Sequence, residues 1–128
     1  MFDAISTVFL VVADLAASRR FYSEQLGLAE VSAKQDHVRY RVGNQFLVIH
    51  GPLPDSVFTA WNMPPARDPR GTGVVLTLRC ADVDAAHAEL LARGVQPLGP
   101  PCDAAWGARM FLLADPSGYV LEVSRPGR

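Results

Sequence analysis

The stretch TVFLVVADLAAS at residues 7–18 decides the fold, because VLTLRCADVDAA repeats its pattern at residues 75–86. Each copy has an apolar run, an Ala-Asp pair and an alanine-rich segment, which indicates a buried strand that leads through a turn into a helix. A duplicated unit that cannot bury its own sheet face packs against its twin. The repeat therefore predicts a pseudo-symmetric fold with a cleft between the halves.

Composition and charge narrow the class of protein. The chain has 128 residues, of which 49% are hydrophobic and 20% charged, as is typical of one globular domain. A net charge of −1 without a long basic run argues against nucleic acid or a membrane surface as partner. The N-terminus lacks the pattern of a secretory signal. Cys80 and Cys102 do not form a metal-type pair. We expect a cytoplasmic protein with reduced cysteines.

The order of predicted elements is βαβββ, twice, which makes the fold class α+β. In the first unit (5–50) we expect a strand at 5–12, a helix from Leu15 to Gln25, and strands at 29–33, 37–42 and 46–50. A proline-rich connector (51–72) shows no clear period. In the second unit (73–125) we expect a strand at 74–79, a helix that starts at Asp82 or Asp84 and ends near Arg93, and strands at 96–98, 109–113 and 119–124. Together they form a single domain (1–128).

The motifs around these elements are more specific than the element order. The first helix reads VADLAASRRFY at residues 12–22 and is followed by Leu26-Gly27-Leu28. The C-terminal part contains Trp106-Gly107, Phe111, Asp115-Pro116-Ser117-Gly118 and Glu122. With these motifs the chain resembles the vicinal oxygen chelate superfamily of glyoxalases, extradiol dioxygenases, fosfomycin-modifying enzymes and bleomycin-resistance proteins. The resemblance implies a half-open barrel that is completed in a homodimer, either domain-swapped or side by side.

The resemblance also implies where a divalent metal would bind in the enzymes of the family. The corresponding positions here are Thr7, Val75, Glu122 and either Val48 or Ile49. Only Glu122 is a good ligand, because valine and isoleucine have no donor atom and a threonine hydroxyl is a poor one. We therefore expect no metal and no cofactor. If a metal is bound, Glu122 and His50 are its candidate ligands.

Alternation along the strands predicts which side chains line the cleft. Thr7, Phe9 and Val11 fall on one side of the first strand, and Val8, Leu10 and Val12 on the other. The walls would be mainly neutral and apolar, which suits a partly aromatic ligand. The candidate ligand-binding residues are Thr7, Phe9, Val11, Tyr40, His50, Trp61, Val75, Thr77, Arg79, Trp106, Arg109, Phe111 and Glu122.

Several of these residues also have a purely structural interpretation. Phe9, Tyr40 and Phe111 could be core residues, and Trp106 could plug the end of the barrel. Trp61 could pack in the connector or contact a partner subunit. Glu122 could pair with Arg79. We expect His37 and His87 to be solvated and Cys80 to lie in the core.

The leading functional hypothesis is metal-independent binding and sequestration of a bulky, partly aromatic small molecule, as in the bleomycin-resistance type. No catalytic residue is assigned, and Glu122 is only a weak candidate for a general base. The alternative is a glyoxalase-like lyase or isomerase, or a dioxygenase, with an atypical metal site at Glu122 and His50. A third hypothesis is a non-catalytic partner domain. The expected partners are a small molecule and a second copy of the chain, with neither nucleic acid nor membrane.

Overall fold

The Ala-Asp pair of each repeat starts a helix through the same contact. The Asp14 side chain accepts a hydrogen bond of 3.0 Å from the Ala17 amide, and the Asp82 side chain accepts one of 3.0 Å from the Ala85 amide. Each aspartate satisfies an amide that has no partner within its helix. The two repeats thus fold alike at the junction between the first strand and the first helix.

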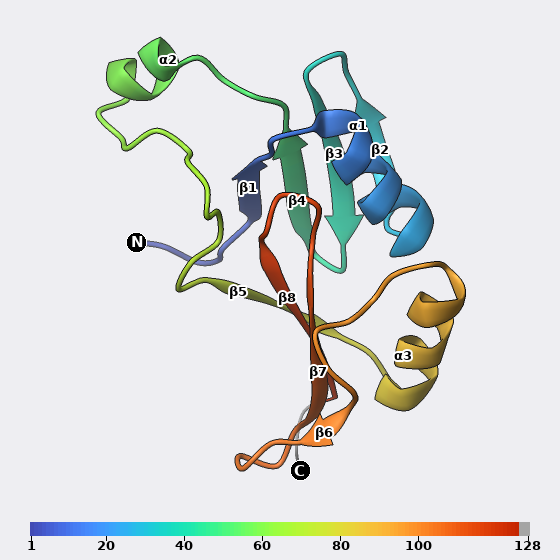
Figure 1. Cartoon of the computed structure of the whole chain (residues 1–128). Helices are drawn as coiled ribbons and strands as arrows, with labels where there is room; N and C mark the ends of the chain where they lie inside the picture. Colours follow the sequence, from blue (N-terminus) through green and yellow to red (C-terminus); the bar gives the residue numbers. More distant parts are fainter. Residues whose placement is uncertain (126–128) are drawn as a thin grey trace. The chain divides into compact units, whose positions relative to one another are not determined.

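The computed structural model describes residues 1–125. It contains two units, Met1–Arg67 (unit 1) and Asp68–Arg128 (unit 2), each of which is described by itself. Figure 1 shows the elements of both. Within the described residues, no helix is both long and apolar enough to cross a membrane.

Unit 1 has a four-stranded sheet in the order β1-β4-β3-β2. Strand β1 runs parallel to β4, and the β2–β3 and β3–β4 pairs are antiparallel. The elements are β1 (Thr7–Val11), α1 (Leu15–Arg19), η1 (Arg20–Gln25), β2 (Ala29–Ala33), β3 (His37–Val42), β4 (Gln45–His50) and α2 (Asp55–Ala60).

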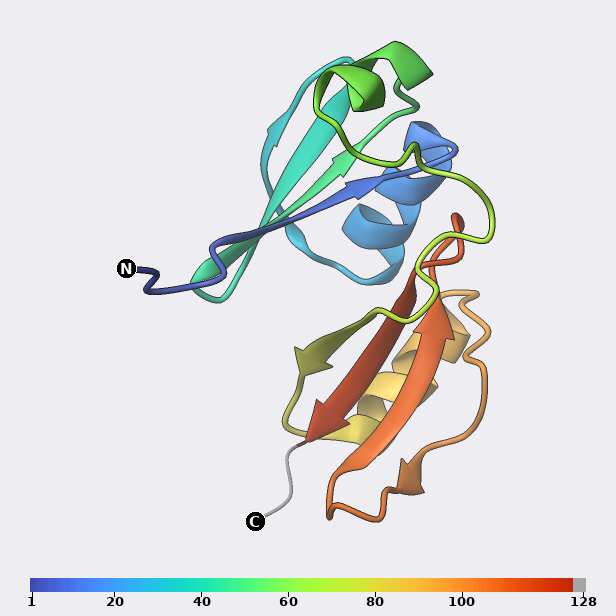
Figure 2. The same cartoon turned by 90° about the vertical axis from the view of Figure 1, so that its left-hand side faces the viewer.

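Unit 2 repeats this topology with a sheet in the order β5-β8-β7-β6. Strand β5 runs parallel to β8, and α3 lies over one face of the sheet (Figure 2). The elements are β5 (Val75–Arg79), α3 (Val83–Ala92), β6 (Cys102–Asp103), β7 (Arg109–Ala114) and β8 (Val120–Arg125). The α+β class and the two four-stranded sheets are confirmed. Each sheet is open at both edges rather than closed into a barrel.

Three local predictions were wrong. The expected helix from Leu15 to Gln25 changes at Arg20 from α-helix to π-helix. The connector, expected to be irregular, contains α2. The strand expected at residues 96–98 is absent, and β6 forms at Cys102–Asp103 instead. Pro97, Pro100 and Pro101 lack the amide that a strand ladder needs, which explains the late start of this strand.

Alternation along each strand separates a covered face of the sheet from an open one. In unit 1 the covered face contains the buried Leu10, Val38, Tyr40, Leu47 and Ile49. In unit 2 it contains the buried Phe111, Leu113, Leu121 and Val123. These side chains form the two cores. The opposite faces, which we call the open faces, carry most of the accessible side chains of the sheets, but Val11, Val48 and Ser124 on them are buried as well.

Candidate functional site

The open face of unit 1 is a grid of nine side chains on three neighbouring strands. Strand pairing sets Thr7 beside Phe46 and Phe46 beside Arg41 in the first row. The second row is Phe9, Val48 and Arg39, and the third is Val11, His50 and His37. We call these nine residues the unit 1 grid. Four of them are cationic or can become cationic by protonation (Arg39, Arg41, His37 and His50), and four carry aromatic rings (Phe9, Phe46, His37 and His50).

Phe46, at the centre of the first row, lies beneath two arginines. The guanidinium carbon of Arg39 is 4.0 Å from the centre of the Phe46 ring, and that of Arg41 is 5.6 Å away. Both distances fall within the range of cation–π attraction. Within residues 1–125 neither guanidinium has a carboxylate partner, and Arg39 Nε is buried without an acceptor. A ligand with an anionic group would supply the opposite charge that these two guanidinium groups lack among the described residues.

A row of rings follows toward the end of β4. Phe9 is 50% exposed, and its ring stacks with that of His50 at a centroid distance of 5.7 Å. His50 in turn stacks with His37 at 5.9 Å. His37 Nδ1 lies 2.8 Å from Asp36 Oδ1, and this contact lowers the pKa of Asp36. His37, which we expected to be solvated, is thus only partly so, because its side chain is 33% exposed and also contacts Asp36 and His50.

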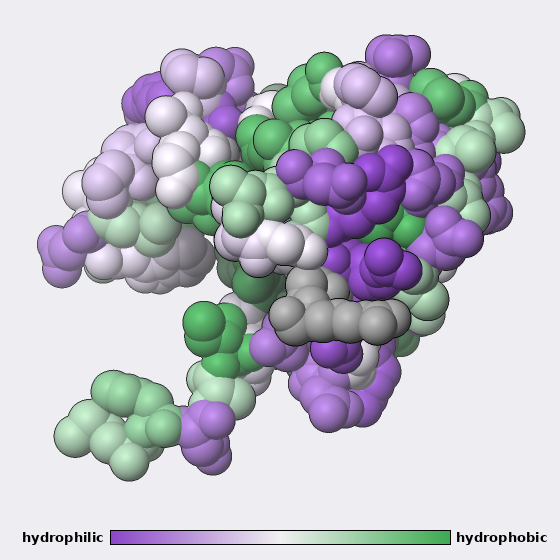
Figure 3. Space-filling model, turned by 90° about the horizontal axis from the view of Figure 1, so that it is seen from below, coloured by the Kyte–Doolittle hydropathy of each residue, from purple (hydrophilic) through white to green (hydrophobic). Residues whose placement is uncertain are grey.

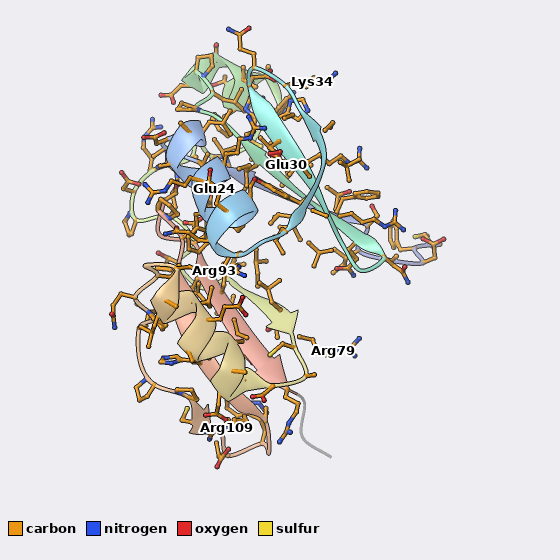
Figure 4. The ribbon with its side chains drawn as sticks, turned by 90° about the vertical axis from the view of Figure 1, so that its right-hand side faces the viewer. Glu24, Glu30, Lys34, Arg79, Arg93 and Arg109 are labelled. Atoms are coloured by element: carbon orange, nitrogen blue, oxygen red, sulfur yellow. The ribbon has the colours of Figure 1, made fainter. Side chains whose placement is uncertain are left out.

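The open face of unit 2 differs in chemistry at the corresponding positions. Its rows are Val75, Val120 and Ala114, then Thr77, Glu122 and Leu112, then Arg79, Ser124 and Met110. Glu122 is half-buried at the centre, and Arg79 is exposed. Figure 4 shows Arg79 projecting from β5 away from α3. Within residues 1–125 no ion pair joins Glu122 to Arg79, so the structural role expected for Glu122 is not observed.

Arg109 is already bound to protein carboxylates. Its Nε and Nη2 donate to the two oxygens of Asp84 at 2.7 Å each, and its Nη1 donates to Asp103 at 3.1 Å. These contacts raise the pKa of Arg109 and lower that of Asp84. Arg109 therefore ties β7 to α3 and β6, which leaves it poorly placed for the ligand contact we expected. Seen from below, this end of unit 2 carries mainly hydrophilic side chains (Figure 3).

Two expected ligand-binding residues lie on the covered faces. Tyr40 is fully buried 6.0 Å from the Tyr22 ring, and its hydroxyl lies 2.8 Å from Ser23 Oγ. Phe111 is 1% exposed, and the His87 ring of α3 meets it edge-on at 5.0 Å. Tyr40 and Phe111 are therefore core residues, which agrees with the structural alternative that the sequence analysis gave for them. His87 packs between helix and sheet, so the prediction that it is solvated was wrong.

The two tryptophans are exposed. Trp61 follows α2, is 57% exposed and meets Phe58 edge-on at 6.5 Å. Trp106 is 71% exposed in the turn between β6 and β7. Trp106 does not plug a barrel end within unit 2. Cys80 is half-buried rather than fully in the core, and burial raises the pKa of its thiol, which makes it a poor nucleophile.

A second concave region lies between α1–η1 and β2 on the helix side of unit 1. It is lined by Arg19, Glu24, Glu30, Lys34 and neighbouring residues, three of which Figure 4 labels. Arg19 binds Glu30 through two contacts of 2.7 and 3.0 Å, and this pairing lowers the pKa of Glu30. Ser23 donates to the same carboxylate at 3.2 Å. The central charges are thus satisfied, which makes this groove a weaker candidate than the open faces.

The residues at the family's metal positions do not fit a metal ion. Thr7 is exposed with only a hydroxyl, and Val75 and Val48 have no donor atom. Glu122 alone offers a carboxylate, whereas a catalytic zinc site needs three protein ligands. His50 is grouped with Asp36 and His37 of unit 1, with ligand atoms within 4.8 Å of one another. Glu122 is not a member of this group.

Comparison with known proteins identifies the class. The sequence profile of the Glyoxalase/Bleomycin resistance protein/Dioxygenase superfamily matches residues 4–123. The chain therefore belongs to this superfamily. Among curated proteins, none matches the chain significantly.

Solved structures similar to the chain include enzymes and a binding protein. A glyoxalase/bleomycin resistance protein/dioxygenase from Nocardioides is 25% identical, with a TM-score of 0.80 over 100% of this chain and 90% of that one. A lactoylglutathione lyase from Agrobacterium tumefaciens is 25% identical, with a TM-score of 0.75 over 97% and 94%. TnmS3, an antibiotic binding protein from a Streptomyces species, is 26% identical, with a TM-score of 0.74 over 98% of each chain.

Sequence reasoning missed Arg39, Arg41, Phe46, His37 and Asp36. The clean alternation of residues 37–42 contained the signal, because it puts His37, Arg39 and Arg41 on the same face of one strand. The sequence-based prediction assigned a face to the first strand of each repeat and to the last strand of the second repeat, but not to residues 37–42 or 46–50. The pairing of β3 with β4 then brings Phe46 between the two arginines.

Proposed function

We propose that the chain is a small-molecule-binding protein for a planar, partly aromatic compound that carries an anionic group. The observation that carries the proposal is the stack of Arg39 on Phe46 in an open sheet face, with no carboxylate partner for the guanidinium within residues 1–125. The exposed Phe9 ring in the next position extends the aromatic surface. Aromatic stacking contributes roughly 0.5–1.5 kcal/mol beyond the burial of apolar area.

The likeness to an antibiotic binding protein supports sequestration as the purpose of binding. The residues at the positions where enzymes of the superfamily hold their metal support ligand binding without a metal at those positions. Glu122 is the only one of these residues with a strong metal ligand. An organic ligand held by stacking and one charged contact fits the typical composition of small-molecule sites, in which few polar groups fix orientation.

The experiment compares two probes of equal ring size. Calorimetric titration of the EDTA-treated protein with 1-pyrenecarboxylate should show saturable binding, and the neutral 1-pyrenemethanol should bind more weakly. The Arg39→Gln variant should lose about 5- to 30-fold in affinity for the carboxylate, equivalent to ~1–2 kcal/mol. Arg20→Gln, which changes an exposed arginine on η1, is the matched control and should bind as the wild type does.

Equal binding of both probes, or equal loss in Arg39→Gln and Arg20→Gln, would contradict the proposal. The enzymatic alternative has its own measurement, suggested by the likeness to a lactoylglutathione lyase. Formation or cleavage of lactoylglutathione by the metal-supplemented protein, abolished in Glu122→Gln, would favour catalysis over sequestration.

A further inference from the structure

The third row of the unit 1 grid ends in a group of side chains that the proposed ligand contacts do not use. His50 at the end of β4, His37 at the start of β3 and Asp36 just before it bring their ligand atoms within 4.8 Å of one another. We propose that Asp36, His37 and His50 form a binding site for one divalent transition-metal ion, for which zinc is the best-fitting example.

The carboxylate of Asp36 lies between the two imidazoles. Its Oδ1 is 2.8 Å from His37 Nδ1, and its Oδ2 is 3.5 Å from His50 Nε2. Two imidazoles and one carboxylate are the ligand types that zinc accepts, and three protein ligands leave a fourth position open. The same set suits other ions that bind imidazole, such as Co²⁺ and Ni²⁺.

The backbone on both sides of the group is held by hydrogen bonds. The Gly51 amide donates to the Asp36 carbonyl at 2.8 Å, which ties the end of β4 to the turn before β3. The Lys34 amide donates to the His37 carbonyl at 2.8 Å across the same turn. The three ligands are therefore attached to a fixed frame, and only side-chain rotation is needed to bring them onto an ion.

His50 already has the tautomer that a metal ligand needs. Its Nδ1 lies 2.8 Å from the Gly51 carbonyl, which can only accept, so Nδ1 carries the proton. In the neutral ring Nε2 then keeps its lone pair and points toward Asp36. Metal-binding histidines commonly donate their other nitrogen to a carbonyl in this way, which fixes the ring and the tautomer.

Metal binding requires a modest contraction. Ligand atoms around a tetrahedral zinc with Zn–N bonds of ~2.0–2.1 Å lie about 3.3 Å apart, closer than the 4.8 Å limit of this group. The rings of His37 and His50 are nearly parallel, at 6° to each other, and must turn to aim their lone pairs at one point. Such rotation is cheap because the last torsion of histidine is broad, and Asp36 is exposed and free to follow.

This site is separate from the metal positions of the superfamily. Those positions correspond to Thr7, Val75, Glu122 and either Val48 or Ile49, none of which belongs to the group. His50 is two residues beyond Val48 on the same strand, at the end of the sheet where Asp36 and His37 lie. The inference goes beyond the proposed function and does not depend on it.

The test uses the untagged, full-length protein after treatment with EDTA. Calorimetric titration with ZnCl₂ should show one ion per chain, and Co²⁺ should give the absorption bands of a site with nitrogen and oxygen ligands. His50→Ala, His37→Ala and Asp36→Asn should each weaken zinc binding by at least ~10-fold, the lower end of the roughly 10- to 100-fold loss that follows removal of even an outer hydrogen-bond partner. Asp36→Asn keeps the shape of an exposed side chain, so it remains informative if a histidine variant folds poorly.

Two controls separate this site from other ligands in the chain. His87→Gln changes the one histidine outside the group, and Cys80→Ser with Cys102→Ser removes both thiols; each should bind zinc as the wild type does. Absence of saturable binding in the wild type would overturn the proposal. Binding that survives loss of both His37 and His50, or that disappears with the cysteines, would overturn it as well. Binding of 1-pyrenecarboxylate is measured in EDTA, so either proposal can fail while the other stands.

Discussion

The guanidinium carbon of Arg39 lies 4.0 Å above the centre of the Phe46 ring, on the face of the sheet that α1 does not cover. An arginine in this position offers both a positive charge and a planar group on which a flat ligand can stack. A lysine offers only the charge. The Arg39→Lys variant can therefore separate the two contributions.

We expect Arg39→Lys to keep the preference for 1-pyrenecarboxylate over 1-pyrenemethanol but to bind both several-fold more weakly. The preference depends on charge, and the affinity for both probes depends on stacking with the guanidinium. The ratio of the two dissociation constants is the measurement. If the ratio falls to one in the lysine variant, the guanidinium binds the anionic group through its hydrogen-bond geometry rather than its charge.

Truncation of Phe111 should mainly lower stability, whereas truncation of Phe9 should mainly weaken ligand binding. The reason is that Phe111 lies in a core and Phe9 on an open face of the sheet. Phe111→Ala removes a ring that is 1% exposed and should cost about 3–5 kcal/mol of unfolding free energy. Phe9→Ala removes a ring that is 50% exposed and should cost less than ~1 kcal/mol, while it weakens the binding of 1-pyrenecarboxylate. Urea unfolding and calorimetry on both variants check this. A stability loss of several kcal/mol in Phe9→Ala would place that ring in a core.

The Tyr40 hydroxyl should matter for stability and not for binding. It lies 2.8 Å from Ser23 Oγ, which itself donates to Glu30, so it belongs to a network on the helix side of unit 1. Tyr40→Phe should lower the unfolding free energy by about 0.5–1.5 kcal/mol. Affinity for 1-pyrenecarboxylate should stay unchanged. A variant that binds the probe more weakly at unchanged stability would show that the hydroxyl reaches the ligand.

The ion pair of Asp84 with Arg109 predicts a loss of stability in acid. The pairing lowers the pKa of Asp84 in the folded state, so the unfolded state takes up its proton first as the pH falls. The stabilisation by this ion pair is therefore fully present above the pKa that Asp84 has in the unfolded state, near pH 4. It is lost as the pH falls through the lower pKa that Asp84 has in the folded state. Urea midpoints measured from pH 7 to pH 2.5 should show a smaller acid-induced decrease in Asp84→Asn than in the wild type. Parallel curves for the two proteins would mean that this pair contributes nothing.

Much of the architecture could be predicted from the sequence because local signals agree with the fold. The Asp of each Ala-Asp pair caps a helix in both repeats, and the alternation of Thr7 and Phe9 against Leu10 and Val12 matches the exposed and buried positions of the first strand. Val11 departs from this alternation, because it is only 8% exposed although it was expected to line the cleft. The strand predicted at 96–98 did not form because Pro97 lacks an amide for the ladder, and Pro100 and Pro101 delay the strand to Cys102–Asp103. The change to a π-helix at Arg20 left no pattern that alternation or capping could detect.

The candidate site was harder to predict because its contacts join strands that are distant in sequence. Arg39 meets Phe46, and His37 meets His50, only through the register of β3 with β4. The Asp84–Arg109 pair likewise joins a helix to a strand 25 residues away. Charge and aromatic character were visible in each segment, but the pairs they form depend on a hairpin register that composition does not set. The homodimer remains a prediction that a measurement of mass in solution can test.

The two faces of each sheet give the chain an unusual freedom to change. Substitutions in the unit 1 grid touch neither Tyr40 nor Ile49, so the selection that preserves folding acts on different side chains from the selection that sets the ligand. A lineage built on this sheet can exchange one target molecule for another by altering a few surface positions, without passing through unfolded intermediates. The same property makes the grid a practical place to engineer new specificities, since libraries restricted to its accessible positions, without the buried Val11 and Val48, should yield mostly folded proteins.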